Sequence, residues 1–293
     1  MCTAISYRTK HHYFGRNLDL ERGYGESVVI TPRNFPFHFR FLGDIEKHYA
    51  MIGMAAIVDG YPLYFEATNE NGLSMAGLHF PKSSFYEGYV NSRENTAPFE
   101  LIPYLLGRCS TVREVRQVMK TVQIVNCDFS ETLPVTPLHW MISDRKESVT
   151  LECTKAGMWL YENKVGVLTN DPPFHQQLEG LNEEKEIPGD FSSRSRFEKA
   201  VYLKEHSVCN GDEQSSVNQF FHMLQAVAMV KGCVKAENGE LEYTRYSSCC
   251  NTDRGVYYWT TYDNFEIQKV DMHAVDLDDK FLARMYTDNM VVR

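Results

Sequence analysis

The feature that most restricts the fold of this 293-residue chain is a repeated pairing of extended segments across tight turns. In residues 61–80 (YPLYFEATNENGLSMAGLHF), Asn71-Gly72 separates two extended runs that are rich in apolar residues. Asn-Gly between two such runs is a strong sequence signal for a β-hairpin. We therefore expect antiparallel strands to form much of the structure.

Three other stretches show the same pattern. Residues 2–9 (CTAISYRT) and 13–20 (YFGRNLDL) predict a strand pair that turns at Lys10, His11 and His12. Residues 148–170 (SVTLECTKAGMWLYENKVGVLTN) predict a meander with turns at 155–157 and near 163–164. Residues 241–264 (LEYTRYSSCCNTDRGVYYWTTYDN) predict a further pair that turns at 253–255. In this last run, Cys249 and Cys250 should face opposite sides of a sheet.

Helical periodicity is confined to the middle of the chain. Thr111 and Glu114 form a capping-box pattern at the start of one such segment. The segments are residues 98–109 (PFELIPYLLGRC), 111–122 (TVREVRQVMKTV), 192–206 (SSRSRFEKAVYLKEH) and 215–232 (SSVNQFFHMLQAVAMVKG), the last ending near Gly232. With no linker, repeat or low-complexity tract, the chain is expected to form one layered α+β domain over residues 1–293.

Composition excludes several classes of protein. The net charge of −9 argues against nucleic-acid binding, which needs clustered Lys and Arg. No run of 18 apolar residues predicts a membrane span, and no basic segment followed by an apolar one predicts a secretory signal. The eight cysteines are scattered and include no CxxC pair, so we interpret them as reduced thiols of a cytoplasmic protein.

Common cofactor and metal motifs are missing from the sequence. There is no GxGxxG, GxxxxGK[ST], HExxH or GxSxG. The ten histidines are dispersed, and the adjacent His11-His12 lies in a predicted turn, where we expect both side chains to be solvated. We therefore expect neither a metal nor a cofactor.

Cys2 is the most conspicuous candidate for a nucleophile. A small residue at position two normally permits removal of the initiator Met1, which would give Cys2 both a thiol and a free α-amine. The two groups can exchange a proton near neutral pH, so one residue can supply both nucleophile and base. Arg16, brought beside the first strand by the predicted hairpin, would favour the thiolate, and Asp19 could hold the ammonium. An inert terminal thiol is the alternative.

Several long blocks of the sequence resemble the choloylglycine hydrolase family, most closely its conjugated bile salt hydrolases from gut bacteria. The blocks are MCTAISY, HYFGRNLDLE, TPRNFPFHFR, YPLYFEATNENGLSMAGL, PLHWMISD, VGVLTNDPPF, PGDFSSRSRF and YSSCCNTDRGVYYWTTYDN. The resemblance implies an N-terminal-nucleophile hydrolase with a four-layer αββα fold. It also implies cofactor-free hydrolysis of the amide that joins a bile acid to glycine or taurine.

The resemblance also implies a catalytic set. The family's residues fall on Cys2, Arg16, Asp19, Asn170 (in VLTNDP) and Arg196 (in SSRSRF). By this analogy the thiolate attacks the amide carbonyl, donors that include Asn170 hold the oxyanion, and the α-amine protonates the leaving nitrogen. Asn170 could instead be only a turn residue, and Arg196 only a surface cation.

His79, in AGLHFP, departs from the family pattern. Bile salt hydrolases usually have Asn at this position, beside the oxyanion hole, and relatives that act on penicillin V tend to have Tyr. Neutral imidazole can still donate one hydrogen bond. We therefore expect His79 to remain a donor, which leaves an acylase acting on penicillin V or another N-acyl amide as an alternative function.

The second departure is a missing segment. Relatives carry a longer stretch between LEGLN and IPGDF, and it packs subunits into a tetramer; here only residues 183–186 join the two blocks. We expect a homo-oligomer, a dimer or a tetramer, that forms a dimer more readily than its relatives do.

A steroid substrate calls for an apolar pocket close to the nucleophile. Weak candidates for its lining are Leu20, Tyr24, Phe65, Phe129 and Leu133. Nothing in the sequence decides between glycine and taurine conjugates. An inactive bile-acid-binding protein is an alternative from another class.

Overall fold

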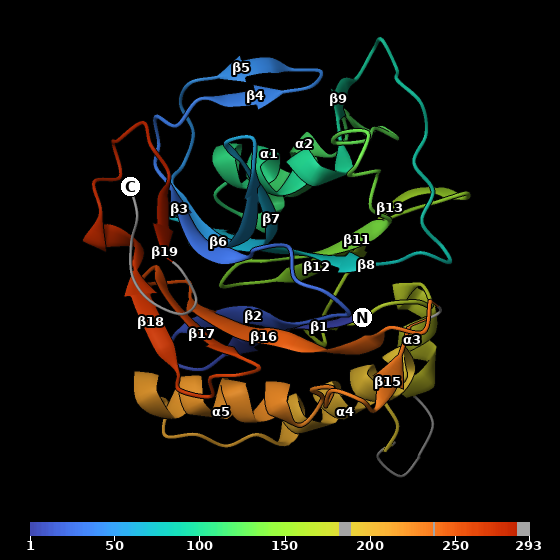
Figure 1. The fold of residues 1–293 in the computed structure, drawn as a ribbon, viewed down its shortest axis with the longest axis vertical. Coiled ribbons are helices and arrows are strands. Elements are labelled where there is room, and N and C mark those ends of the chain that lie inside the picture. The colour runs from blue at the N-terminus through green and yellow to red at the C-terminus, as the bar shows by residue number, and fades with distance from the viewer. Residues whose placement is uncertain (182–188, 237, 286–293) are drawn as a thin grey trace.

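Four layers make up the fold: helices, a sheet, a second sheet and more helices (Figure 1). The computed structural model describes residues 1–181, 189–236 and 238–285. Within these residues, all neighbouring strands in the two large sheets run antiparallel. The four-layer αββα arrangement expected from the sequence is therefore confirmed.

The first sheet contains the N-terminal strand pair at its centre. Its seven strands are, in spatial order, β14 (Val167–Leu168), β1 (Cys2–Arg8), β2 (His12–Leu20), β16 (Leu241–Asn251), β17 (Val256–Thr261) and β18 (Gln268–Asp271), with β15 (Val234–Lys235) paired to β16. Strands from the two ends of the chain thus lie side by side, because β2 pairs with β16.

The second sheet contains the predicted Asn-Gly hairpin. Its eight strands are, in spatial order, β13 (Gly157–Glu162), β12 (Ser148–Thr154), β11 (Leu138–Ser143), β8 (Ser74–His79), β7 (Tyr61–Asn69), β6 (Met51–Val58), β3 (Ser27–Thr31) and β19 (Ala283–Met285). Two small sheets lie outside it: β4 (Phe37–Phe39) pairs with β5 (Gly43–Ile45), and β9 (Glu94–Thr96) pairs in parallel with β10 (Val122–Ile124).

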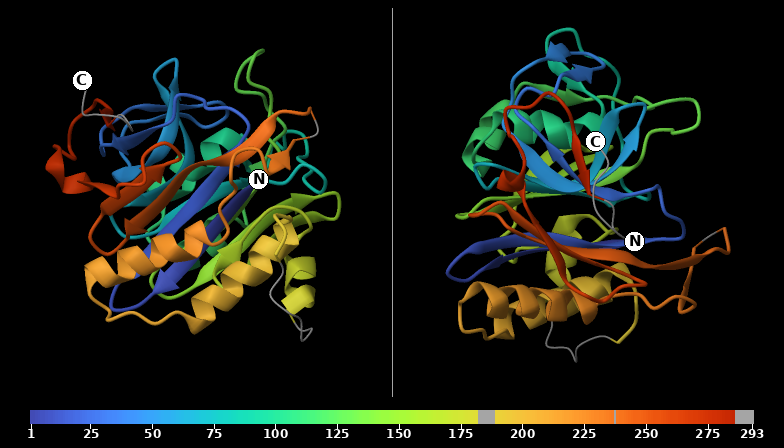
Figure 2. Two further views of the ribbon diagram at one scale, coloured as in Figure 1. Left: turned by 60° about the horizontal axis from the view of Figure 1, so that its bottom comes forward. Right: turned by 60° about the vertical axis from the view of Figure 1, so that its left-hand side comes forward.

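Helices cover the outer face of each sheet. Both views in Figure 2 show α4 and α5 together on the outer side of the first sheet, and α1 packs on β7 and β8 of the second. The helices are α1 (Leu101–Arg108), α2 (Val112–Val118), α3 (Phe174–Leu181), α4 (Ser193–His206) and α5 (Glu213–Gln225), with short 3-10 turns at Pro98–Glu100 and Met272–Ala274. No pattern in the sequence predicted α3.

The side chains of the second sheet alternate between two hydrophobic clusters. Val28 and Ile30 of β3 belong to the cluster that fills the space between the sheets and continues under α4 and α5. Val29 points the other way and packs in the cluster with α1 and α2. This period of two is expected of a strand buried on both faces, and it gives the site that follows a rigid, water-poor surrounding.

Two sequence predictions are wrong at turns. His12 is not solvated: it begins β2, is fully buried, and its ring nitrogens bond the hydroxyls of Ser6 and Thr252 at 3.0 and 2.8 Å. Burial lowers its pKa to about 3. Its neighbour His11 lies in the turn as expected and pairs with Asp253.

The third strand of the predicted meander also does not continue its sheet. β12 and β13 form the expected hairpin, but β14 crosses to the first sheet and pairs with β1. Gly166 makes the crossing possible, since its φ is +62° and an added Cβ would lie 3.0 Å from the carbonyl oxygen of Ser6. Asn163 stabilises the crossing by accepting a 2.8 Å bond from the Gly166 amide. The crossover brings residues 169 and 170 beside the chain's beginning.

Candidate active site

Cys2 is the first residue of β1, where its side chain faces the second sheet. It lies opposite Leu18 of β2, and Arg16 lies opposite Ala4. Opposed residues share a face, as do alternate residues along a strand, so Cys2 and Arg16 point into the same space between the sheets. Cys2 is 2% exposed. Burial gives this terminal residue the order that a free chain end would lack.

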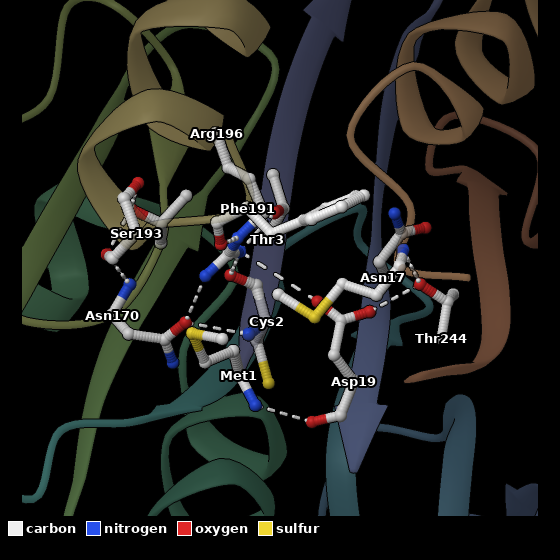
Figure 3. A network of polar contacts seen from close by, with 12 residues as sticks. Met1, Cys2, Thr3, Asn17, Asp19, Asn170, Phe191, Ser193, Arg196 and Thr244 are labelled. Carbon is white, nitrogen blue, oxygen red and sulfur yellow. Dashed lines mark hydrogen bonds and ion pairs between the residues drawn. The ribbon is translucent and has the colours of Figure 1, made fainter. Parts of the chain in front are cut away.

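Asn170 follows β14 and contacts the backbone of Cys2 (Figure 3). Its Oδ1 accepts a 2.7 Å bond from the Cys2 nitrogen, the atom that becomes the α-amine if Met1 is removed. Its Nδ2 donates to the carbonyl oxygen of His79 at 2.7 Å, and its own amide donates to Ser193 Oγ at 2.8 Å. The side-chain amide of Asn170 is therefore held at both its oxygen and its nitrogen, and its backbone is held to α4.

Arg196, in the first turn of α4, approaches Cys2 from the helix side of the sheet (Figure 3). Nη1 donates to the Cys2 carbonyl at 2.5 Å and to Thr3 Oγ1 at 2.8 Å, and Nη2 donates to Asn170 Oδ1 at 2.9 Å. Burial lowers the pKa of Arg196, while Asp19 and Cys2 oppose this shift. The guanidinium holds the backbone of the nucleophile and the amide that contacts it as one unit.

Asp19 lies on the same side of the sheet as Arg196. Its Oδ1 accepts a 2.6 Å bond from Thr244 Oγ1, and its Oδ2 is 3.8 Å from Arg196 Nη1. Oδ2 is buried and has no hydrogen-bond partner among the described residues. A buried carboxylate oxygen without a donor can accept one from a group that is formed or bound later, such as an ammonium.

Met1 occupies the space next to Cys2. Its amine donates to the carbonyl oxygen of Asp19 at 2.6 Å and pairs with the carboxylate of Glu242. Burial lowers the pKa of this amine. With Met1 present, the nitrogen of Cys2 is part of a peptide bond and cannot act as a base. Proton exchange between the thiol and the α-amine of Cys2 therefore requires removal of Met1.

The side chain of Arg16 crosses from the first sheet to the backbone of the second. Its Nη1 donates to the carbonyl oxygens of Phe65 and Gly77 at 3.0 and 2.5 Å. Its Nη2 is buried and bonds none of the described residues. Burial opposes the charge, but neighbouring groups, Cys2 first among them, raise the pKa of Arg16 above its ordinary value. A fixed cation therefore shares the interior space with the thiol, as the hairpin predicted.

His79 ends β8 beside Asn170. Its carbonyl is held by the Asn170 amide, and its imidazole is partly buried. Burial lowers the pKa of His79, the chain's amine lowers it further, and Asp171 opposes the shift. The ring is therefore neutral at pH 7 and can donate one hydrogen bond.

The candidate pocket residues fall into two groups. Leu20 and Phe65 pack against the cluster that contains Cys2, and the ring centroids of Tyr24 and Phe65 are 6.4 Å apart. Phe129 and Leu133 belong to one loop, joined by a 3.1 Å backbone bond. Phe129 packs instead on Phe99 and Tyr61, with centroids 5.1 and 6.0 Å away.

One site contact depends on an irregularity that sequence patterns did not reveal. The pairing of β2 with β16 shifts between Thr244 and Tyr246, as at a β-bulge. Residues two apart normally share a face, but the bulge sends Thr244 to Asp19 and Tyr246 to the opposite side. Thr3, which bonds Arg196, was also missed. Threonines in strands carry no signal that separates a bonding partner from an ordinary strand residue.

Among the residues that the structure describes, no three His, Cys, Asp or Glu side chains gather as metal ligands. Within the same residues, no helix is both long and apolar enough to cross a membrane.

Comparison with known proteins identifies close relatives over the whole chain. A family model for linear amide C–N hydrolases of the choloylglycine hydrolase family matches residues 2–187 and 182–284. A bile salt hydrolase/transferase of Lactiplantibacillus plantarum is 44% identical over 305 residues, which covers 95% of this chain and 94% of that protein. A conjugated bile acid hydrolase of Lactobacillus acidophilus is 37% identical over 309 residues, covering 94% and 98%.

Solved structures agree with the sequence matches. A mutant of the conjugated bile acid hydrolase of Clostridium perfringens superposes with a TM-score of 0.91 at 31% identity, covering 100% of this chain and 99% of that one. A penicillin V acylase of Agrobacterium tumefaciens has a TM-score of 0.81 at 19% identity, covering 97% and 91%, and shares the fold. The family match is in two pieces that meet at residues 182–187. The segment expected to be missing therefore falls at this junction, and it lies outside the described residues.

Proposed function

Because the chain belongs to the choloylglycine hydrolase family of linear amide C–N hydrolases, we propose that it hydrolyses the amide of glycine- and taurine-conjugated bile acids through Cys2. The observation that carries this proposal is the 2.7 Å contact between the Cys2 nitrogen and Asn170 Oδ1. It joins the start of the chain to a polar residue 168 positions away, an arrangement that an inert terminal thiol does not need.

In the acylation step, the Cys2 thiolate attacks the carbonyl carbon of the conjugate. Arg16 shares the interior space with the sulfur and favours its anionic form. The second hydrogen of Asn170 Nδ2 is a donor for the oxyanion, and we expect the imidazole N–H of His79 to be another. The α-amine of Cys2 gives a proton to the leaving nitrogen, the C–N bond breaks, and glycine or taurine departs.

Deacylation reverses the roles. The α-amine, now neutral, takes a proton from water, which attacks the thioester carbonyl. The carbon–sulfur bond then breaks and releases the free bile acid. Asn170 Oδ1 already contacts this nitrogen, and we expect the unpartnered Asp19 Oδ2 to accept a second bond from the ammonium that forms. No step calls for a metal or a cofactor.

His79 keeps one alternative substrate class open. Because this side chain differs from the Asn that bile salt hydrolases usually have there, an acylase that acts on penicillin V or another N-acyl amide with the same Cys2 nucleophile is the alternative. Retention of Met1 would favour an inactive bile-acid-binding protein, because a blocked amine cannot act as a base.

A single set of measurements separates these functions. The intact mass shows whether Met1 is removed, and amine release is followed on glycocholate, taurocholate and penicillin V for the wild type and Cys2→Ala. We expect the mature chain to start at Cys2, to turn over the conjugates fastest, and to lose all turnover in Cys2→Ala. Binding without turnover in the wild type, or faster release from penicillin V, would refute the assignment.

We further propose a cytoplasmic bacterial enzyme that forms a homo-oligomer, and that forms a dimer more readily than its relatives do. All eight cysteines lie in the described part of the chain and are free, which agrees with a reducing compartment. The short connection at residues 183–186 supports the smaller assembly. Light scattering that shows a stable tetramer would contradict it.

A further inference from the structure

Glu66 is a buried carboxylate of β7 to which the proposed reaction assigns no role. It is 2% exposed and points from the second sheet toward the first. Its Oε2 accepts a 2.6 Å bond from Tyr246 and lies 3.9 Å from Arg16 Nε. Its Oε1 accepts bonds from the hydroxyls of Ser248 and Tyr257. Every one of these contacts comes from a strand of the first sheet.

Two irregularities bring this group to Arg16. The bulge in β16 turns Tyr246 toward Glu66. The pairing of β6 with β7 shifts as well, so that Met54 lies opposite Glu66 and Ala55 opposite Tyr64, which leaves Phe65 without an opposed residue. The Phe65 carbonyl, next to Glu66, accepts a bond from Arg16. Bulges that re-aim groups in this way are typical of the surroundings of active sites.

The hydroxyls that bond Glu66 prevent it from forming a direct hydrogen-bonded ion pair with Arg16. A bare carboxylate and a guanidinium usually form a direct, two-pronged pair. Here hydroxyls occupy both oxygens, and the nearest approach to Arg16 is 3.9 Å, longer than a hydrogen bond. Glu66 therefore attracts Arg16 without taking up its donors. Burial raises the pKa of Glu66, while Arg16 and the hydroxyls oppose that shift.

The consequence is a guanidinium with one edge left free. Nη1 is held by two carbonyl oxygens, whereas Nη2 is buried without a partner among the described residues. We propose that Glu66, restrained by Tyr246, Ser248 and Tyr257, is a positioning residue that keeps the free edge of Arg16 toward the sulfur of Cys2. This rests on the proposed role of Cys2 as nucleophile.

The test uses the alkylation rate of Cys2 by iodoacetamide at pH 7, followed by mass spectrometry of the N-terminal peptide, which requires no substrate. If Glu66 positions Arg16, Glu66→Gln slows alkylation severalfold, because Arg16 moves off the thiolate. If Glu66 were only a counter-charge, its loss would favour the thiolate and speed alkylation. If its role were merely structural, the rate per folded molecule would not change. Either of the last two results overturns the proposal.

A double-mutant cycle shows whether the effect passes through Arg16. In an Arg16→Gln background, Glu66→Gln should leave the alkylation rate unchanged, and equal slowing in both backgrounds would refute the positioning role. Tyr257→Phe, which removes one hydroxyl, should slow alkylation less and carries the test if Glu66→Gln does not fold. Glu213→Gln is the matched control, since Glu213 accepts a 2.6 Å bond from Tyr258 and pairs with Arg254.

Turnover gives a second readout. Glu66→Gln should lower kcat per titrated Cys2 by about tenfold and change KM by less than about threefold, because the contact acts on the reacting sulfur and not on substrate binding. The assay uses whichever conjugate or penicillin the wild type cleaves fastest. An error in the assigned substrate therefore leaves this test, like the alkylation cycle, intact.

Discussion

Replacement of Asn170 tests the site most directly, because its two amide atoms have different partners. Oδ1 accepts from the Cys2 nitrogen and Arg196, while Nδ2 donates to His79 O and has one hydrogen left for an oxyanion. Loss of one oxyanion donor typically lowers kcat by about 10²–10³, or about 2.7–4 kcal/mol. Since Asn170→Ala also removes the acceptor of the α-amine, we expect the upper end of that range, about 10³ in kcat.

Asn170→Asp separates the two atoms. The carboxylate keeps the acceptor for Cys2 but loses the donor, so kcat should fall nearly as far as in Asn170→Ala, with KM changed by less than about threefold. Turnover on glycocholate and taurocholate is measured per titrated thiol, with Asn126→Ala, at an exposed position, as the control. If Asn170→Asp retained wild-type kcat, or Asn170→Ala lost less than about tenfold, Asn170 would not be an oxyanion donor.

Further predictions concern the nucleophile and two histidines. Cys2→Ala should abolish turnover and still bind conjugates, as isothermal titration calorimetry would show; residual turnover would exclude Cys2 as the nucleophile. His79→Ala should lose much more activity than His79→Asn, since Asn retains a donor, and equal rates for wild type and His79→Ala would discard that role. The folded-state pKa of His12 is about 3 and its ordinary value is 6.5, so folding excludes a proton that the unfolded chain binds. Above pH 6.5, His12 is neutral in both states and does not reduce the free energy of unfolding. As the pH falls from 6.5 toward 3, the unfolded chain gains this proton and the free energy of unfolding decreases. Urea titrations between pH 8 and 5 should show the wild type losing about 2 kcal/mol more than His12→Asn, whereas parallel losses would contradict the burial of His12.

The sequence predicted structure well wherever a turn or a cap is local. Asn71-Gly72 lies between β7 and β8, with Gly72 at φ +84°, and Thr111 caps α2 by accepting a bond from the Glu114 amide. Prediction failed where contacts between residues far apart in the sequence determine the end of an element. Residues 226–230 continue the helical period, yet α5 ends at Gln225, because the next turn bonds β16 instead, with the Met229 amide donating to Thr244 Oγ1 at 2.8 Å.

The site shows the same division. Cys2 and Arg16 could be placed together from a hairpin, since their registers follow from one short turn. Asn170 and Arg196 were assigned by resemblance alone, because the crossover at Gly166 and the approach of α4 leave no local pattern. Glu66 was not singled out at all. A single Glu in a strand carries no local sign of burial, and its partners Tyr246, Ser248 and Tyr257 lie 180 to 191 positions further along the chain.

Cys2 lies near the start of the chain, whereas several residues that contact it or Met1 lie in the second half. These residues are therefore synthesised later than Cys2. Cys2 leaves the ribosome well before Asn170, Arg196 and Glu242, the last of which pairs with the amine of Met1. A chain that ends before Asn170 thus carries Cys2 and Arg16 but lacks the two residues that hold the backbone of Cys2 in the folded protein. Removal of Met1 in that interval would precede the pairing of its amine with Glu242 of β16.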